Sequence, residues 1–463
     1  MTFADKTTLG QSAVLGIKQG ANINQNQFNW LGTIFYLSYL AFQYPQNLAL
    51  QRLPIGKWIS INVLVWAIAL LCHGACHSFG ALFAVRFIMG ICEGAITLGF
   101  LLVTSMFYTR AEQMRRVGYW YLMNGVAVIV LGFLAFGVLH IHTGGFMLWQ
   151  WLTTITGIMT LIVAVLFWFL FPDSVVTARI LSPEERVAAV QRIRINQTGV
   201  ENKTWVFAVF AAVTNLINSL TNQRQLIVNE FGFSVINTTL IGCVDGLVEI
   251  AAIFISVTLA AVWPNGRIYA AVLCFLPALV GTFLVSTLAF YIKGGLLVSY
   301  WLSIFGIPPF AIFLSWMDMV TAGHTKRECY TALLLCKIYY LTSNGPKGIT
   351  TNAIVFTAYG LGNAVGPFMW KAQYSPRNHV PWDIFSGVCV VSVLLLLLAR
   401  WMLARENARR DREAEQNGST KSDAYDDVYI EGLDAEGWKV KTHVDRAFLD
   451  LTDIQNREFR YPL

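Results

Sequence analysis

The stretch ALFAVRFIMGICEGAITLGFLLVTSMF, residues 81–107, decides the fold of this chain. It is uncharged except at two positions, Arg86 and Glu93. A membrane-spanning α-helix needs about 20 mainly apolar residues, so the stretch predicts such a helix. A charged side chain at the centre of a bilayer costs roughly 2.5–3.5 kcal/mol on insertion scales, which makes Arg86 and Glu93 candidates for a functional role.

The composition of the whole chain agrees with a protein built from such helices. Of its 463 residues, 56% are hydrophobic and 13% are charged, whereas a soluble domain is about 25% charged. These figures exclude a disordered, fibrous or disulfide-stapled secreted protein. The net charge is +6, and the basic residues behind it fall in short loops between apolar runs. We therefore expect an integral membrane protein that contacts the lipid bilayer and has no nucleic-acid partner.

Further apolar runs of spanning length flank residues 81–107. They lie at residues 28–50, 58–78, 117–140, 147–171, 205–223, 238–262, 267–291, 296–320, 350–370 and 382–404. Residues 1–17 are too short and too polar for a complete span, but they would form the second half of one. Basic residues such as Arg52, Arg110 and Arg405 gather on one side of these spans, and the positive-inside rule makes that side cytosolic. We predict twelve spans, the first one truncated, with both termini in the cytosol.

The charged stretch 172–204 divides the predicted spans into two sets of six. Within it, Ser182, Pro183 and Glu185 are typical of an N-cap, a first helical residue and an acidic first turn. The predicted fold is therefore an all-α polytopic membrane protein in four parts. These are an N-terminal six-helix bundle at 1–171 with an incomplete first span, a cytosolic connector at 172–204, a C-terminal six-helix bundle at 205–405 and an acidic cytosolic tail at 406–463.

Several longer strings carry a resemblance to a known family. They are residues 5–9 (DKTTL), 86–93 (RFIMGICE), 108–118 (YTRAEQMRRVG), 172–174 (PDS), 321–327 (TAGHTKR) and 362–367 (GNAVGP). Together with the six-plus-six layout, they resemble the fungal allantoate permease family of anion:cation symporters, within the major facilitator superfamily. The resemblance implies the twelve-helix major facilitator fold and the plasma membrane. It also implies proton-coupled symport of a small organic anion, such as allantoate, ureidosuccinate, a related ureido acid or a short peptide.

The chain departs from this family in ways that keep alternatives open. Its first span is truncated, and residues 328–349 form an atypical insert without a counterpart in the family. An inactive or non-transporting membrane protein is therefore one alternative. A transporter of a vitamin-like monocarboxylate, such as nicotinate, pantothenate or biotin, is another.

The resemblance places the first helix of each three-helix repeat, spans 1, 4, 7 and 10, around a central cavity. Arg86 and Glu93 on span 4 share one helix face about 10.5 Å apart, so they do not pair directly. Asp5 of span 1, lying between or beside them, would complete a mixed-charge site. A desolvated carboxyl group there can bind and release a proton, and an arginine can hold a substrate carboxylate through two hydrogen bonds. The alternative is that Arg86 only snorkels at a membrane rim and that Glu93 is a structural hydrogen-bond partner.

Polar residues at helical spacing mark spans 7 and 8. Asn215, Asn218 and Asn222 on span 7 are three and four residues apart, which predicts one polar face. Their amides offer donors and acceptors to a ureido group, although hydrogen bonds between helices, worth about 0.6 kcal/mol each, are an equal alternative. Asp245 and Glu249 share a face of span 8, where we favour a structural role.

A third set of residues is expected to gate the cytosolic side. Gly56 and Lys57 keep the end of the loop motif that the superfamily carries after span 2. Asp318 precedes the TAGHTKR loop, and its partners there are expected to be basic. The predicted gating residues are Gly56, Lys57, Asp318, Lys326 and Arg327.

The motifs of enzymes are missing from the sequence. It has no nucleophile elbow, phosphate-binding loop or set of metal ligands, and its cytosolic parts are too short for a catalytic domain. Most cysteines lie in apolar runs, where a thiol behaves as a small hydrophobe. We therefore expect a transporter that needs no cofactor or metal, with a small organic anion and protons as its partners.

Overall fold

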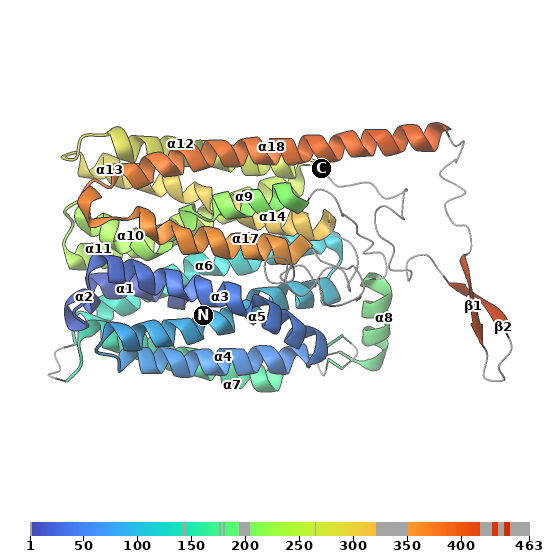
Figure 1. The fold of residues 1–463 in the computed structure, drawn as a ribbon, viewed down its shortest axis with the longest axis horizontal. Helices are drawn as coiled ribbons and strands as arrows, with labels where there is room; N and C mark the ends of the chain where they lie inside the picture. The colour runs from blue at the N-terminus through green and yellow to red at the C-terminus, as the bar shows by residue number, and fades with distance from the viewer. Residues whose placement is uncertain are drawn as a thin grey trace, which may run out of the picture.

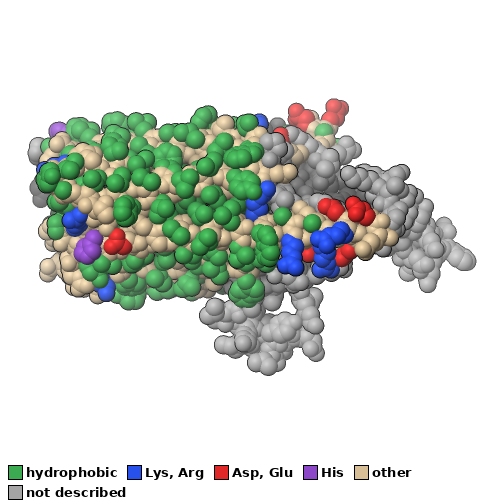
Figure 2. Space-filling view, turned by 90° about the horizontal axis from the view of Figure 1, so that it is seen from above, with side chains coloured by type: hydrophobic (Ala, Val, Ile, Leu, Met, Phe, Trp, Pro, Cys, Tyr) green, Lys and Arg blue, Asp and Glu red, His purple; other side chains and the backbone are tan. Residues whose placement is uncertain are grey.

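The computed structural model of the chain describes residues 2–141, 145–175, 177–178, 181–193, 204–263, 265–320, 351–416, 428–433 and 439–444. Its helices lie side by side along one axis and form an elongated body (Figure 1). Within the described ranges, nine helices are long and apolar enough to cross a membrane. Hydrophobic side chains cover the length of the body, and basic side chains gather toward its ends (Figure 2). The chain is therefore an integral membrane protein with an all-helical body.

The N-terminal helices, α1 to α7, pack against one another. They are α1 (Thr2–Val14), α2 (Ile17–Gly20), α3 (Gln25–Arg52), α4 (Ile55–Gly74), α5 (Phe79–Phe107), α6 (Arg110–Val138) and α7 (Leu148–Leu170). The start of α3 is fixed by a capping box. Gln27 N donates to Asn24 Oδ1 at 2.8 Å, and Asn24 N donates to Gln27 Oε1 at 3.0 Å.

The helix α8 (Pro183–Ile193) follows α7 and begins where the sequence predicted. Glu185 N donates to Ser182 Oγ at 3.2 Å, and Ser182 N donates to Glu185 Oε2 at 2.8 Å, so Ser182 is the N-cap. The helix lies beside one end of the body (Figure 1). We call this the connector end. The far end is the opposite one, where α2 and the turn between α10 and α11 lie.

The C-terminal helices pack as a second group. They are α9 (Thr204–Thr214), η1 (Ile217–Ser219), α10 (Leu220–Glu230), α11 (Val235–Val262), α12 (Arg267–Thr287), α13 (Lys293–Ser303), η2 (Ile304–Gly306), α14 (Pro308–Val320), α17 (Thr351–Val365), η4 (Gly366–Met369), η5 (Ala372–Tyr374) and α18 (His379–Gln416). The acidic tail contains an antiparallel pair, β1 (Val428–Leu433) and β2 (Lys439–Val444). These strands lie apart from the helical body (Figure 1).

Two predicted spans of the C-terminal group are broken helices. Span 7 consists of α9 and α10 joined by η1, and it extends to Glu230 instead of ending at residue 223. Span 10 consists of α13 and α14 joined by η2. Pro308 begins α14, where its missing N–H group and fixed φ are compatible with a first turn.

The two groups meet along several helix pairs. α6 packs on α11, α3 on α17, α1 on α10, and α14 on α6. Hydrogen bonds join the groups toward the far end: Asn29 Nδ2 donates to the carbonyl of Trp370 at 2.8 Å, and Thr33 Oγ1 donates to that of Ala364 at 3.0 Å. The space left between these contacts is the cavity described next.

Candidate functional site

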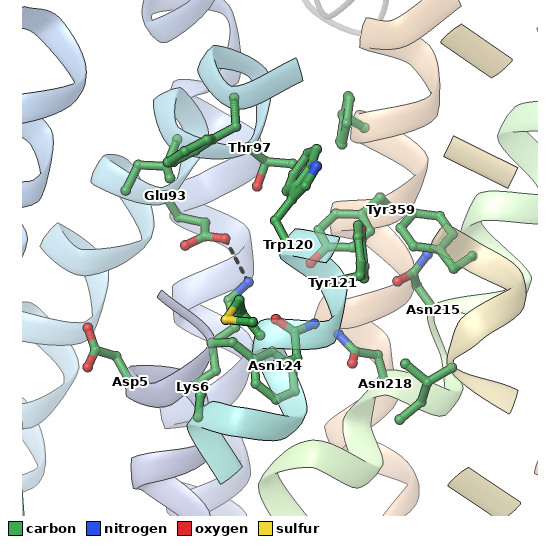
Figure 3. Close-up of a pocket in the computed structure, with 18 of the residues that line it drawn as sticks. Asp5, Lys6, Glu93, Thr97, Trp120, Tyr121, Asn124, Asn215, Asn218 and Tyr359 are labelled. Carbon is green, nitrogen blue, oxygen red and sulfur yellow. Dashed lines mark hydrogen bonds and ion pairs between the residues drawn. The ribbon is translucent and has the colours of Figure 1, made fainter. Parts of the chain in front are cut away.

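A cavity of about 320 Å³ lies between the N-terminal and C-terminal helices. Asp5, Lys6 and Glu93 lie on one side of it and Asn215 and Asn218 on the other, with the rings of Trp120 and Tyr121 between them (Figure 3). The polar lining residues are Asp5, Lys6, Glu93, Thr97, Asn124, Thr160, Thr214, Asn215 and Asn218. The aromatic ones are Phe3, Trp66, Phe100, Trp120, Tyr121, Phe167, Phe310, Phe356 and Tyr359.

An ion pair crosses the N-terminal side of this wall. Lys6 Nζ lies 2.7 Å from Glu93 Oε1, and the two side chains are only 11% and 4% exposed. The ammonium group also lies 5.7 Å and 5.8 Å from the ring centroids of Phe35 and Tyr36, which favours the cationic form. The second carboxylate oxygen of Glu93 has no hydrogen-bond partner among the described residues. Both side chains line the cavity.

Lys6 was missed in the sequence analysis. It directly follows Asp5 in the DKTTL string, so the signal was present. Consecutive residues of opposite charge on a helix point in different directions, so Asp5 and Lys6 need separate partners.

Asp5 and Arg86 form a second buried region of opposite charge. They are 1% and 2% exposed and act on each other electrostatically. Arg86 Nε lies 3.4 Å from His73 Nε2, while both Asp5 oxygens and Arg86 Nη2 are unpartnered within the described part of the chain. Because Arg86 is buried, the alternative in which it snorkels at a rim is wrong. Asp5 lines the cavity and Arg86 does not, so a direct contact of Arg86 with substrate stays a prediction.

The structure brings two of the three predicted asparagines to the cavity. Asn218 Nδ2 donates to Asn363 Oδ1 at 2.6 Å, and Asn363 Nδ2 donates to Asn215 Oδ1 at 3.3 Å. Asn363, from the GNAVGP string, was not singled out in the sequence. Asn222 does not line the cavity. The predicted face is interrupted because η1 breaks the helix, and the Asn222 amide instead lies against Gly32 of α3.

The structure describes two of the predicted gating residues, Gly56 and Lys57, with their contacts. Lys57 N donates to Asp173 Oδ1 at 3.2 Å, and Lys57 Nζ donates to the carbonyl of Trp168. A Cβ on Gly56 would lie 2.8 Å from the carbonyl oxygen of Phe171, so only glycine fits there. The turn after α3 is therefore docked on the end of α7 at the connector end.

The remaining predicted gating residues have no described side chains. Asp318 lies in α14, but its side chain is outside the described part of the structure, as are Lys326, Arg327 and the insert 328–349.

Comparisons with known proteins agree with this geometry. The family described as Major Facilitator Superfamily matches residues 1–334. The chain is 29% identical to the thiamine pathway transporter of Saccharomyces cerevisiae, over 100% of this chain and 82% of that protein. It is 28% identical to the high affinity cysteine transporter of the same yeast, over 100% and 87%, and 26% identical to its allantoate permease, over 100% and 82%.

A solved structure shows the same fold. The partially occluded inward open conformation of the xylose transporter from E. coli superposes with a TM-score of 0.61 at 11% identity, covering 86% of this chain and 96% of that one. The relatives named above are transporters, and together with the family match they support a secondary transporter. The chain belongs to the major facilitator superfamily, and the predicted resemblance to the allantoate permease family is confirmed.

Proposed function

We propose that the chain imports a small organic anion together with protons across the plasma membrane, with both termini in the cytosol. The leading substrates are allantoate, ureidosuccinate, related ureido acids and short peptides. The observation that carries this proposal is the Lys6–Glu93 ion pair in the cavity wall, at 2.7 Å. A buried cation that faces a cavity is a binding site for a carboxylate.

The same pair supplies a way to couple the anion to a proton. When a substrate carboxylate binds Lys6, the Glu93 carboxylate loses its partner in a largely apolar cavity. An isolated buried carboxylate is costly, so Glu93 takes a proton instead. Anion and proton therefore occupy the cavity together, and both leave when it opens to the other side. Asp5, beside Arg86, is the second candidate for carrying a proton.

The amide groups of Asn215 and Asn218 support a ureido substrate. Each offers a donor and an acceptor without a charge, which suits a urea group that also donates and accepts. The ring-lined wall around Trp120, Tyr121 and Tyr359 favours the second candidate, a flat monocarboxylate such as nicotinate. The cavity volume lies at the lower end of the range of about 300–1,000 Å³ for small-molecule sites, which is compatible with both.

The test is uptake of labelled allantoate into liposomes that contain the purified chain, with an inward proton gradient. Competitors are ureidosuccinate, nicotinate, pantothenate, biotin, cysteine and thiamine. We expect ureido acids to compete best. Competition by nicotinate alone would favour a transporter of vitamin-like monocarboxylates. No uptake of any of these compounds would favour a non-transporting protein.

The proton step is tested with Glu93→Gln. This variant should bind and exchange the anion but lose accumulation driven by the proton gradient, because the amide cannot release a proton. Glu184→Gln, on the exposed surface of α8, is the matched control and should accumulate substrate normally. Gradient-driven accumulation by Glu93→Gln would remove Glu93 from the proton path.

A further inference from the structure

Three asparagine side chains are linked by hydrogen bonds at the C-terminal wall of the cavity. Asn215 and Asn218 line the cavity, whereas Asn363 of α17 does not and is only 1% exposed. Asn218 Nδ2 donates to Asn363 Oδ1 at 2.6 Å, and Asn363 Nδ2 donates to Asn215 Oδ1 at 3.3 Å. Asn363 is therefore bonded to both of the amides that line the cavity.

Backbone carbonyl groups fix the direction of two of these amides. Asn215 Nδ2 donates to the carbonyl of Ala211 at 2.8 Å. Asn363 Nδ2 donates to the carbonyl of Tyr359, also at 2.8 Å. Because a carbonyl oxygen only accepts hydrogen bonds, each asparagine must turn its NH2 group toward it. Reversing either amide would place two acceptor oxygens against each other.

The direction of the third amide follows from that of Asn363. With its NH2 group turned toward Tyr359, Asn363 presents Oδ1 to Asn218, which must therefore donate its Nδ2. The Oδ1 atom of Asn218 accepts from Thr221 Oγ1 at 3.1 Å. A hydroxyl group can donate or accept, so Thr221 is compatible with either direction of the amide. Among the described contacts of Asn218, the bond to Asn363 is the one that sets its direction.

The packing of α17 against span 7 holds Asn363 in place. A Cβ on Gly362, the residue before it, would lie 2.2 Å from the carbonyl oxygen of Ala212. A Cβ on Gly366, three residues after it, would lie 2.7 Å from the Cβ atom of Ser219. The backbone on both sides of Asn363 is thus in close contact with span 7. A binding group is held precisely when the residue that supports it lies on such a rigid element.

The hydrogen bonds already made leave a definite pattern for a substrate. An amide group has two N–H donors and two acceptor lone pairs. Asn215 and Asn218 each use one donor and one acceptor position in the bonds given above, so each keeps one of either kind. The Asn218 amide points toward the side of the cavity where Asn124 and Lys6 lie (Figure 3). A ureido group donates and accepts, which satisfies this pattern, whereas a carboxylate only accepts and leaves the free acceptors unpaired.

We propose that Asn363 is a positioning residue that makes the C-terminal wall selective for a ureido or carboxamide group over a second carboxylate. It acts by fixing the direction of the Asn218 amide. Without Asn363, that amide can turn its whole NH2 group toward the substrate, and both N–H donors become available to a carboxylate. This inference deepens the proposed function and rests on it for the role of Lys6, which binds the first carboxylate on the other side of the cavity.

The test compares two ligands that share a skeleton. Ureidosuccinate and succinate each carry two carboxylates, and only the first has a ureido group. Isothermal titration calorimetry on the purified full chain, without a proton gradient, gives the Kd of each. We expect the native chain to bind ureidosuccinate more tightly. Asn363→Leu, of similar shape but without polar atoms, should reduce the ratio of the two affinities roughly three- to tenfold, the worth of about one hydrogen bond. A loss of folded protein lowers the bound amount of both ligands alike and leaves this ratio unchanged.

Two further variants accompany the measurement. Ser386→Ala is the matched control, because it removes a hydrogen bond between α18 and α12, from Ser386 Oγ to Thr282 Oγ1 at 2.9 Å, and neither residue lines the cavity. It should keep the native ratio. Asn363→Ser replaces the leucine variant if that variant does not fold. A serine hydroxyl both donates and accepts, so it sets no direction for Asn218 and the ratio should fall as well.

The outcomes separate this inference from the proposed function, because binding is measured without transport. A native ratio in a folded Asn363 variant would overturn the inference, as would a native chain that binds succinate as tightly as ureidosuccinate. A ratio that falls equally in Ser386→Ala would overturn it too, since the effect would then be one of general packing. If the ratio falls only in the Asn363 variants while liposomes fail to accumulate the anion, the proposed function fails and the positioning role stands. Binding of neither ligand by the native chain would overturn both.

Discussion

At the scale of single residues, two neighbours on α1 reach two positions on α5. Asp5 acts on Arg86 and Lys6 pairs with Glu93, and the partners on α5 lie two helical turns apart. The consequence is that anion binding and acid–base chemistry are assigned to different side chains. In the proposed function Lys6 binds the substrate carboxylate, whereas Arg86 does not line the cavity and instead contacts His73 and acts on Asp5.

The sign of the substrate charge can be tested by one substitution in the opposite wall. Asn218→Asp adds a carboxylate of nearly the same shape on the C-terminal side of the cavity. At an effective dielectric constant of about 20, a like charge about 6–7 Å away costs roughly 2–3 kcal/mol. We therefore expect the KM for an anion to rise roughly tenfold or more, measured by concentration-dependent uptake. Asn218→Ser, which removes the amide without adding charge, is the control. A lower KM in Asn218→Asp would indicate a cationic substrate instead.

Buried charges could be predicted from the sequence where they interrupt an apolar run, and could not where polar residues surround them. Arg86 and Glu93 stand out because they interrupt a long apolar run, and both are buried as expected. Arg224 is equally buried, but the polar string around it, TNQRQ, ended the predicted span at residue 223 and left it in a loop. An apolar run does not mark a helix such as α10, whose polar residues are buried against other helices of the protein. The partner of each charge depends on contacts between distant segments, which periodicity does not contain.

At the scale of helices, glycines on α5 and α17 allow close packing against neighbouring helices. A Cβ on Gly90 of α5 would lie 2.0 Å from the carbonyl oxygen of Phe35 in α3, and one on Gly362 of α17 would lie 2.2 Å from that of Ala212 in α9. Backbone atoms cannot move aside as a side chain can. These glycines therefore set the distance between their helices, as small residues do at helix interfaces in membranes.

The α3–α5 contact gives a prediction about stability. Gly90→Ala should force α5 away from α3 and destabilise the fold by about 1–3 kcal/mol, the usual cost of overpacking. Gly80→Ala, on the same helix with open space around its Cβ position, should be neutral or slightly stabilising because alanine favours helix. Thermal unfolding of both purified variants checks this. Equal melting temperatures for the two variants would mean that α5 and α3 are free to separate.

The break between α9 and α10 could not be predicted from the sequence. The break at η1 contains no proline or glycine, since residues 215–219 read NLINS. It turns Asn215 and Asn218 toward Asn363 of α17 while α10 continues toward α1 and α3. Contacts with other helices therefore decide its position, and discontinuous helices at the midplane are typical of transporter sites.

At the scale of the whole molecule, one seam joins the N-terminal helices to the C-terminal ones through α6 and α11. Gly118, Gly125 and Gly132 repeat every seven residues along α6 and face α11. At the middle of the seam, a Cβ on Gly125 would lie 2.6 Å from the carbonyl oxygen of Gly246, and the reverse distance is also 2.6 Å. Each bundle thus rests on the backbone of the other. This contact is a natural pivot for the alternating access that transport requires.

This pivot leads to a prediction for the balance between conformations. Gly125→Ala should force α6 away from α11. It should also weaken the contact of α10 with α1, because both contacts belong to the same interface between the two groups of helices. The thiol of Asn222→Cys, in the Cys72→Ser background, should then react with a water-soluble maleimide several-fold faster. Gly137→Ala lies on the same helix with nothing near its Cβ position, and it should leave the rate unchanged. If Gly125→Ala folds normally and also leaves the rate unchanged, the two groups of helices do not move about the α6–α11 contact. The contact of α3 with α17 would then be the alternative pivot.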